Sequence, residues 1–285
     1  MRDEPLERAK TLSRTAAEIV LTHGSDGQNG EPNMLNLDLS GRTALVTGAS
    51  GELGRVMVRT LAAAGADVAI HYHGNRSKAE ELSAECGQKG VRSCVIRADI
   101  TRKDDIAAMR ATVTAALGAP DIMVNNAVIQ YGWTSVLEQA EADYESQFRS
   151  CVMQNVLMAQ AFVPAMKAKG WGRVIGINTE CTMQCWPSQS AYIAGKAGMD
   201  RVLRVLAKEV GEFGITVNQV APGWTISENR TDAETPQWYL DKVALKRRGT
   251  DQEIANAVAF LASDLASFIT GVYLPVCGGS VMPAI

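Results

Sequence analysis

The 285-residue chain is short of histidine, has no dense cysteine pattern and carries no excess of positive charge. Its net charge is −3 with both signs interspersed, so the composition provides no basic surface for nucleic acid or an anionic membrane. The six cysteines are too sparse for a disulfide scaffold. Cys181 and Cys185 are close enough in sequence to suggest a metal pair, but the three histidines, His23, His71 and His73, lie far from them. We therefore expect no metal site.

Long apolar runs are also missing. No stretch approaches the roughly 20 consecutive apolar residues that a membrane-spanning helix needs. The N-terminus mixes acidic with basic residues and lacks the apolar core of a secretory signal peptide. These absences predict a soluble, cytoplasmic protein without a membrane partner. A hydrophobic content of 46% over this length is enough for one substantial core.

The first 37 residues differ in character from the rest. Residues 4–22 carry a narrow apolar stripe at helical spacing, and residues 24–32 have the glycine-rich composition of a flexible linker. The sequence thus predicts an N-terminal helix and linker over 1–37, followed by one larger domain over 38–285. The helix either docks on the body of the protein or a neighbouring subunit, or remains a frayed tail.

From residue 38 onward, short apolar stretches rich in β-branched residues alternate with amphipathic ones. Strands are expected at 44–46, 67–72, 91–96, 120–125, 173–178, 215–220 and 271–276. Helices are expected between Gly54 and Gly65 and at 77–88, 104–117, 141–169, 190–212 and 251–263, with Pro164 bending or interrupting the longest. This alternation predicts an α/β fold, a three-layer, Rossmann-type, doubly wound parallel sheet of seven strands in a single domain. Ligands of such sheets bind at the carboxyl ends of the strands.

Three glycines separate the first strand from the first helix of this domain. Gly48, Gly51 and Gly54 allow a sharp turn and a close approach of the backbone to a ligand. The amides at the start of the helix then face an anion, and the pattern favours a pyrophosphate. The alternative is that the three glycines form a tight turn that binds no ligand. The position between strand and helix favours a dinucleotide site, so the domain over 38–285 is expected to bind a dinucleotide.

The end of the second strand indicates which dinucleotide. NAD sites usually place an acidic residue there, whereas basic residues accommodate a 2′-phosphate. The stretch 72–77 has no carboxylate, and Arg76 and Ser77 offer a guanidinium and a hydroxyl, which favours NADP(H). The alternative is a solvated loop whose Ser77 caps the next helix. Asp99, after the third strand, either hydrogen-bonds the adenine or turns the chain before Thr101.

A tyrosine and a lysine four residues apart open the predicted helix over 190–212. Tyr192 and Lys196 therefore lie on one helix face. A phenol with a pKa of about 10 is a poor acid–base catalyst at neutral pH, and a nearby ammonium group stabilises its phenolate. Thr179, at the end of the fifth strand, brings a hydroxyl to the same edge. Such tyrosine–lysine pairs are usually packing plus a surface charge, but this one shares a sheet edge with the glycine turn.

Together these features resemble the short-chain dehydrogenase/reductase family over nearly all of residues 38–282. The residues that carry the resemblance are Thr47-Gly48-x-x-Gly51-x-x-Gly54, Asn125-Asn126-Ala127, Tyr192-x-x-x-Lys196, Val217-Asn218 with Pro222-Gly223, and Gly271 with Gly278-Gly279. Residues 253–263 are similar to the 3-oxoacyl-carrier-protein-reductase-like group, a broad group of ketoreductases with unrelated substrates. The resemblance implies an NAD(P)-dependent oxidoreductase acting on CH–OH and C=O groups.

The resemblance also assigns roles to residues. It implies that Tyr192 is the general acid/base, that Lys196 lowers its pKa and binds the nicotinamide ribose, and that Thr179 takes the place of the usual serine. The expected cofactor-binding residues are Gly48, Ser50, Gly51, Leu53, Gly54, His73, Asn75, Arg76, Ser77, Asp99, Ile100, Asn125, Ala127, Tyr192, Lys196, Pro222, Gly223, Thr225 and Ser227.

The sequence departs from the family pattern at three positions. Glu52 stands where single-domain members usually have glycine, and a carboxylate beside pyrophosphate must point away or weaken binding. Val128 replaces a common glycine and crowds the substrate side of the nicotinamide pocket. Cys151 replaces an asparagine that often completes a catalytic tetrad, and a thiol cannot supply both amide functions. Asn155, one helical turn on, is a partial substitute.

Aromatic and polar residues in the loops after the strands are the expected substrate contacts. The main candidates are Gln130, Trp133, Cys181, Trp186 and Trp224, with Tyr131, Met183, Gln184, Trp238 and Tyr239 beside them. The tryptophans suggest a roomy apolar or aromatic substrate, although part of them can instead cover the core or a subunit contact. Residues 227–248 are polar and long enough to act as a lid. By resemblance, the long helices over 141–169 and 190–212 build a homotetramer or homodimer.

The leading hypothesis is NADPH-dependent, reversible reduction of a ketone, with Tyr192 giving the proton to the nascent alkoxide. One alternative is a catalytically impaired NADP(H)-binding regulatory protein. Another is a non-redox lyase or isomerase on the same scaffold.

Overall fold

The computed structural model describes residues 37–227 and 235–283. The helix expected over 4–22 and the linker that follows it lie outside the described residues, as does part of the expected lid.

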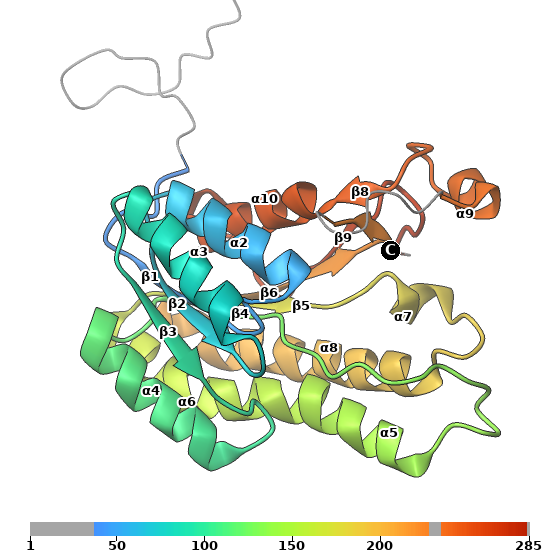
Figure 1. The fold of residues 1–285 in the computed structure, drawn as a ribbon, viewed down its shortest axis with the longest axis horizontal. Coiled ribbons are helices and arrows are strands. Elements are labelled where there is room, and N and C mark those ends of the chain that lie inside the picture. Colours follow the sequence, from blue (N-terminus) through green and yellow to red (C-terminus); the bar gives the residue numbers. More distant parts are fainter. Residues whose placement is uncertain (1–36, 228–234, 284–285) are drawn as a thin grey trace, which may run out of the picture. The chain divides into compact units, whose positions relative to one another are not determined.

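In the described residues, seven parallel strands form one sheet in the order β3-β2-β1-β4-β5-β6-β9 (Figure 1). The chain leaves the middle of the sheet at β1, moves outward to β3, and returns to the other side at β4. The strands are β1 Thr43–Val46, β2 Asp67–Tyr72, β3 Ser93–Arg97, β4 Ile122–Asn125, β5 Gly172–Ile177, β6 Ile215–Pro222 and β9 Tyr273–Val276. The predicted doubly wound α/β fold is therefore confirmed, with strand ends shifted by up to two residues.

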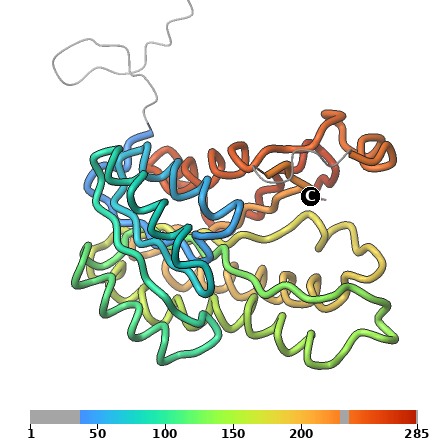
Figure 2. The backbone as a smooth tube through the Cα atoms, in the orientation of Figure 1, coloured from blue at the N-terminus to red at the C-terminus, as the bar shows by residue number. Residues whose placement is uncertain are grey.

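Helices cover both faces of this sheet, giving three layers (Figures 1 and 2). One face is covered by α2 Glu52–Ala63, α3 Arg76–Gln88 and α10 Asp251–Ala262. The other is covered by α4 Lys103–Leu117, α6 Gln154–Lys169 and α8 Ser190–Val210. The remaining elements are α5 Glu141–Gln147, the π-helical segment Phe148–Met153, α7 Cys181–Gln184, α9 Gln237–Lys242, the 3₁₀ turns Gly211–Phe213 and Asp264–Ala266, and the short parallel pair β7 Thr225–Ile226 and β8 Gly249–Thr250.

The strands explain why the core splits in two. Successive side chains of a strand point to opposite faces. Ala44 and Val46 of β1 join the apolar cluster that contains α2, α3 and α10, whereas Leu45 joins the cluster of α4, α6 and α8. Both faces of the strand are fully buried. A strand that is apolar on both faces needs helices on both sides, as the sequence pattern predicts.

The single helix predicted over 141–169 is wrong in one respect. Pro164 lies inside α6 without ending it, and the regular helix is instead interrupted earlier, by the π-helical segment 148–153. The side chain of Gln154 donates to the carbonyl of Ser150 at 2.7 Å, and that of Asn155 donates to the carbonyl of Cys151 at 2.6 Å. Side-chain amides thus donate hydrogen bonds to backbone carbonyls of the π-helical segment. The periodicity of apolar residues does not predict this interruption of the regular helix.

Candidate active site

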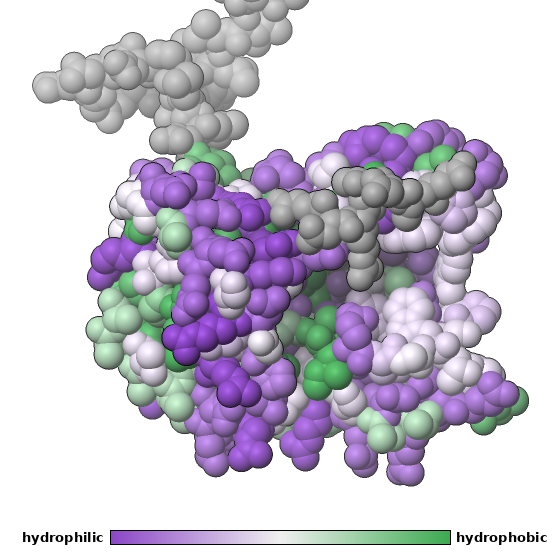
Figure 3. Space-filling view, in the orientation of Figure 1, coloured by the Kyte–Doolittle hydropathy of each residue, from purple (hydrophilic) through white to green (hydrophobic). Residues whose placement is uncertain are grey.

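A cleft of about 790 Å³ opens along the carboxyl ends of the strands. The space-filling view shows this face hollowed, with apolar side chains gathered inside the hollow (Figure 3). The glycine turn after β1, the ends of β2, β4 and β5, and the start of α8 all contribute to its wall. Parallel strands bring these segments together because their carboxyl ends share one edge of the sheet.

The glycine turn is packed too tightly for side chains at two of its positions. Gly48 has φ +62°, a left-handed conformation, and a Cβ there would lie 3.0 Å from Ala127 Cα. A Cβ on Gly54 would lie only 2.3 Å from the carbonyl oxygen of Gly48. The helix α2 begins directly after this turn, and no side chain caps its first amides. A cradle of bare backbone with free amides fits the pyrophosphate of a dinucleotide.

A buried histidine that belongs to none of the sequence motifs fixes this turn to the sheet. The Nδ1 atom of His71 accepts a hydrogen bond from the Gly48 amide at 2.9 Å, so Nε2 carries the proton and donates to the carbonyl of Ala98 at 3.0 Å. Burial lowers the pKa of His71, against the opposing effect of the Ala98 carbonyl. The neutral ring therefore ties the turn, β2 and the chain after β3 together. The sequence cue was a lone polar residue inside an apolar strand.

Thr47 and Asn126 add a second set of ties. The hydroxyl of Thr47 accepts from the amides of Asn126 and Ala127, both at 3.0 Å, and pairs with Gln154 at 3.1 Å. The side chain of Asn126 donates to the carbonyls of Thr47 and Gly48. Asn125 is fully buried and donates to Asn155 at 2.7 Å, away from the cleft. The asparagine that reaches the cleft is thus Asn126, which was not among the predicted contacts.

Three of the residues predicted to bind the adenosine end are turned toward their own helix, whereas His73 and Ile100, also predicted, line the cleft. The side chain of Asn75 caps α3 by accepting from the Lys78 amide, Arg76 pairs with Glu80 at 2.7 Å, and Ser77 donates to Glu81 at 2.9 Å. None of the three predicted residues lines the cleft. Asp99 does line it, and its carboxylate accepts from the amide and hydroxyl of Thr101, as the turn interpretation expected.

The three predicted catalytic residues come together in the wall of the cleft. Lys196 is 3% exposed, and its Nζ donates to the carbonyl of Ile177 at 2.5 Å and lies 5.8 Å from the centre of the Tyr192 ring. Thr179 accepts from the Cys181 amide at 3.2 Å, which leaves its own proton to donate. All three residues line the cleft.

The electrostatics of this pair differ from the expectation that the ammonium lowers the tyrosine pKa. Burial raises the pKa of Tyr192, and the Thr179 hydroxyl opposes that rise only in part. Burial likewise lowers the pKa of Lys196. Both shifts favour the neutral forms because each charge is withdrawn from water. The protein alone thus keeps the proton on the phenol, ready for donation.

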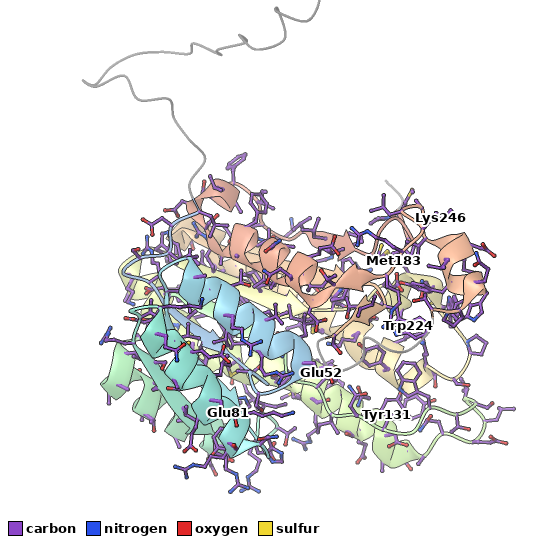
Figure 4. The ribbon with its side chains drawn as sticks, turned by 45° about the horizontal axis from the view of Figure 1, so that its top comes forward. Glu52, Glu81, Tyr131, Met183, Trp224 and Lys246 are labelled. Atoms are coloured by element: carbon purple, nitrogen blue, oxygen red, sulfur yellow. The ribbon has the colours of Figure 1, made fainter. Side chains whose placement is uncertain are left out.

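Residues of the loop after β4 hold the tyrosine in place. The hydroxyl of Tyr131 accepts from the backbone amide of Tyr192 at 2.6 Å. The ring of Trp133 stacks on that of Tyr192 with centroids 5.8 Å apart. In Figure 4, Tyr131 lies in this loop, and Glu52 stands at the first turn of α2 across the cleft. Tyr131 is a positioning residue, and Trp133 stays a predicted substrate contact.

A second cavity of about 630 Å³ meets the first at Thr179 and Tyr192. It is lined by all five main substrate candidates, Gln130, Trp133, Cys181, Trp186 and Trp224. Gln184, Trp238 and Tyr239 also line it, whereas Tyr131 and Met183 do not. Thr225 and Ser227, predicted to touch the cofactor, lie on this second cavity. The sequence did not single out Glu180, Gln189, Arg248 and Asp251, which complete its wall.

Glu52 faces the junction of the two cavities and lines both of them. Its carboxylate accepts a hydrogen bond from the hydroxyl of Ser227, in the segment that follows β7. The carboxylate is therefore directed toward the second cavity. This agrees with the expectation that Glu52 must point away from a pyrophosphate at the glycine turn.

Cys151 sits in the π-helical segment, with its thiol 3.8 Å from the side-chain oxygen of Gln147. Asn155, the suggested substitute for the missing asparagine, uses its oxygen for Asn125 and its nitrogen for the carbonyl of Cys151. Its nitrogen thus serves the π-helical segment and its oxygen serves Asn125 of β4, so both ends of this amide are engaged.

Over the described ranges, no three histidine, cysteine, aspartate or glutamate side chains gather as metal ligands would. The described helices include none with the length and apolar content to cross a bilayer.

Comparisons with known proteins agree with this geometry. The family model described as enoyl-(acyl carrier protein) reductase matches residues 48–280. The chain is 35% identical to the 3-oxoacyl-[acyl-carrier-protein] reductase FabG of Staphylococcus epidermidis, covering 85% of this chain and 99% of that protein.

Two solved structures are similar over most of the chain. One is a 7α-hydroxysteroid dehydrogenase complexed with NADH and 7-oxo glycochenodeoxycholic acid, with TM-score 0.81, 31% identity, and coverage of 87% of this chain and 97% of that one. The other is a gluconate 5-dehydrogenase from Burkholderia cenocepacia in complex with NADP and tartrate, with TM-score 0.80, 30% identity, and coverage of 86% and 97%.

The residues matched by the family model include the glycine turn, Tyr192, Lys196 and the residues that line both cavities. These matches confirm the resemblance drawn from the motifs, and the protein is an NAD(P)-dependent oxidoreductase acting on CH–OH or C=O groups. The chain belongs to the short-chain dehydrogenase/reductase family, in its 3-oxoacyl-carrier-protein-reductase-like group.

Proposed function

We propose that the protein catalyses the reversible, NADPH-dependent reduction of a ketone, with Tyr192 as the general acid/base. The observation that carries the proposal is the meeting of the two cavities at Thr179 and Tyr192. One cavity has the bare backbone cradle of a dinucleotide site, and the other has an aromatic wall. When bound, the reduced nicotinamide supplies the hydride.

The chain's own groups handle the oxygen of the substrate. The Thr179 hydroxyl, which accepts from the Cys181 amide, donates to the carbonyl oxygen and holds it beside the phenol. The phenol of Tyr192 then donates its proton as negative charge develops on that oxygen. Lys196 lies one helical turn away, and although burial lowers its pKa, its ammonium form stabilises the resulting phenolate. In the oxidative direction, the same phenolate accepts the alcohol proton.

The test is turnover of purified protein with NADPH and a panel of ketones, followed by the absorbance of the reduced nicotinamide. We expect wild-type turnover and a loss of about 10³-fold in kcat for Tyr192→Phe, because general acid catalysis contributes about 10²–10⁴-fold. Calorimetry should show NADPH affinity within about threefold of wild type, since the ring and its stacking remain. Equal turnover of the variant would exclude the phenol as the general acid. Tight NADPH binding by the wild type without turnover of any ketone would favour the regulatory alternative.

The preference for NADP(H) over NAD(H) is supported by the end of β2, where residues 72–77 contain no carboxylate. Arg76 lies at the start of α3 with its side chain 73% exposed and paired with Glu80. An exposed pair of this kind contributes little to stability, so a phosphate can replace the carboxylate at small cost. The preference for NADP(H) therefore requires Arg76 to exchange its ion pair with Glu80 for one with the 2′-phosphate.

Arg76→Ala should weaken NADPH by about tenfold while changing NADH by less than about twofold, because only NADPH has the 2′-phosphate. Glu80→Gln is the matched control, since it frees the guanidinium and should leave NADPH binding unchanged or tighter. Titration of each dinucleotide by fluorescence measures both. Equal weakening of NADH and NADPH in Arg76→Ala would remove the cofactor preference.

We also propose a homodimer or homotetramer in the cytoplasm, assembled through α5, α6 and α8. Phe148, in the π-helical segment between α5 and α6, and Val205, on α8, are large apolar residues that are 53% and 56% exposed. The six cysteines are free thiols, as suits a reducing compartment. Light scattering of wild type and the Phe148→Glu, Val205→Glu double variant tests the assembly. A wild-type monomer would rule it out.

A further inference from the structure

The second cavity contains a buried carboxylate that the catalytic mechanism does not use. Glu180 directly follows Thr179, and its backbone amide donates to the carbonyl of Pro222 at 3.0 Å, which fixes the residue between β5 and β6. The residue is 4% exposed. Its Oε1 atom is 3.5 Å from the hydroxyl of Tyr239, at the outer limit of a hydrogen bond. Its Oε2 atom is buried and accepts no hydrogen bond from the described residues.

A second acceptor on the same wall is also open. Gln189 lines the cavity just before α8, and its Oε1 atom is buried without a hydrogen bond in the described part of the chain. Gln184, by contrast, has its amide nitrogen bound to the Ser280 hydroxyl at 2.9 Å. A buried polar atom without a partner costs about 1–3 kcal/mol, and buried polar groups in proteins are nearly always satisfied. Two such oxygens on one cavity wall indicate a ligand that brings donors.

The rest of the wall is aromatic. The rings of Trp186 and Trp238 lie 4.9 Å apart, and the ring of Tyr239 meets that of Trp224 edge-on at 5.3 Å. Figure 4 shows Trp224 in the loop beyond the strand ends. Flat rings of this kind pack against the C–H faces of a ring or chain.

The chain's own cations already occupy faces of these rings. The ammonium of Lys242 lies 4.1 Å from the centre of Trp186, and the guanidinium of Arg248 lies 4.5 Å from that of Trp224. A cationic ligand would meet these charges, so an ammonium group is disfavoured as the donor. Neutral hydroxyl groups meet no such repulsion.

We propose that the substrate of this cavity is a hydroxylated ketone or its polyol, with at least one hydroxyl besides the reacting oxygen donating to Glu180 or Gln189. Its C–H face packs on the tryptophan wall, and a purely hydrocarbon ketone leaves both acceptors unsatisfied. The inference deepens the proposed ketone reduction and rests on it. Burial raises the pKa of Glu180, and the nearby Ser280, Gln184 and Tyr239 side chains oppose the rise, although none of them makes a hydrogen bond to Oε2. A donor at Oε2 stabilises the ionised carboxylate further.

Matched pairs of ketones test this specificity at saturating NADPH. Cyclohexanone is compared with 2-, 3- and 4-hydroxycyclohexanone, using wild type, Glu180→Gln and Glu180→Leu, with Glu85→Gln on α3 as a control carboxylate. We expect wild type to prefer at least one hydroxyketone by about 100-fold or more in kcat/KM, because a site built for a hydroxyl rejects the analogue lacking it. Glu180→Gln should lower that preference by about tenfold, chiefly through KM, with kcat/KM for cyclohexanone within about threefold.

Two results would overturn the inference. One is equal wild-type kcat/KM for cyclohexanone and all three hydroxyketones, and the other is an equal loss for both classes in Glu180→Gln. If Glu180→Leu does not fold, the isosteric Gln variant decides alone. Quenching of tryptophan fluorescence by cyclohexane-1,2-diol with NADP⁺ present separates the two proposals. Quenching that Glu180→Gln weakens, without turnover of any ketone, removes the proposed reduction but retains the hydroxyl-binding wall.

Discussion

The two cavities that meet at Tyr192 are built on different principles. The nucleotide side is closed by the chain's own hydrogen bonds, with Gly48 held by His71 and Asn126. The substrate side is walled by loop aromatics and leaves oxygens of Glu180 and Gln189 without partners. The nucleotide side suits one invariant ligand, whereas the substrate side suits a ligand that supplies the missing hydrogen bonds. An invariant ligand requires particular residues at a particular spacing, which the sequence shows as a motif. A ligand that differs between proteins requires only residues of a general type.

The largest expected effect comes from breaking the nucleotide side at Gly54. In Gly54→Ala, the new Cβ would lie 2.3 Å from the Gly48 carbonyl oxygen, so the turn must open. We expect NADPH affinity to fall by about 100-fold or more and the free energy of unfolding to drop by about 3 kcal/mol. Calorimetric titration and urea unfolding measure these changes.

Gly87→Ala on α3 is the matched control, because nothing lies within 4 Å of a Cβ there and its backbone is not left-handed. It should leave NADPH binding unchanged and stabilise the fold by about 0.5–1 kcal/mol. Normal NADPH affinity in Gly54→Ala would show that the turn does not hold the dinucleotide.

A substitution on the substrate side should act on the substrate alone. Trp238 is 47% exposed and touches Trp186, Trp224 and Tyr239. We expect Trp238→Ala to raise KM for the ketone by about tenfold, with kcat changed less than about threefold and NADPH affinity unchanged. Steady-state kinetics and NADPH titration separate the two sides, with Phe268→Ala, at a fully exposed ring, as control. A matching loss of NADPH affinity would mean that the cavities are not independent.

The histidine of the nucleotide side predicts a pH dependence of stability. Because burial lowers the pKa of His71 below its usual value of about 6.5, the unfolded chain binds this proton more readily than the folded one. Its contribution is fully present above about pH 6.5 and is lost as the pH falls toward the folded pKa, with a slope of up to about 1.4 kcal/mol per unit.

Urea unfolding of wild type and His71→Asn at several pH values between about 7.5 and 5 checks this slope. The asparagine oxygen can still accept from the Gly48 amide, so the variant removes titration while keeping an acceptor. We expect a shallower fall in unfolding free energy for the variant. Parallel curves would show that the ring binds its proton as readily in the folded state as in the unfolded chain, so that folding does not lower its pKa.

The sequence could predict the fold because apolar strands and amphipathic helices have different periods, and the sheet follows from their alternation. The sequence could also place Tyr192, Lys196 and Thr179 together. Residues four apart share a helix face, and a residue at the end of a parallel strand lies at the carboxyl edge of the sheet, so both positions follow from short stretches of sequence. The partners of His71 and Glu180 depend on contacts across the fold, such as the one between Glu180 and Tyr239, which spacing along the chain does not encode. The sequence also did not predict the direction of side chains, since the Arg76 side chain points toward Glu80 and forms an ion pair with it.

The π-helical segment 148–153 gives the long helix one residue more than a regular coil would hold. Before it, the carbonyl of Gln147 lies where a Cβ on Gly195 of α8 would come within 2.9 Å. After it, Gln154 reaches Thr47 beside the glycine turn. Deleting one residue here would rotate one half against the other by about 100° and draw them about 1.5 Å closer. The extra residue thus sets the phase between α8, the helix that carries Tyr192, and the glycine turn after β1.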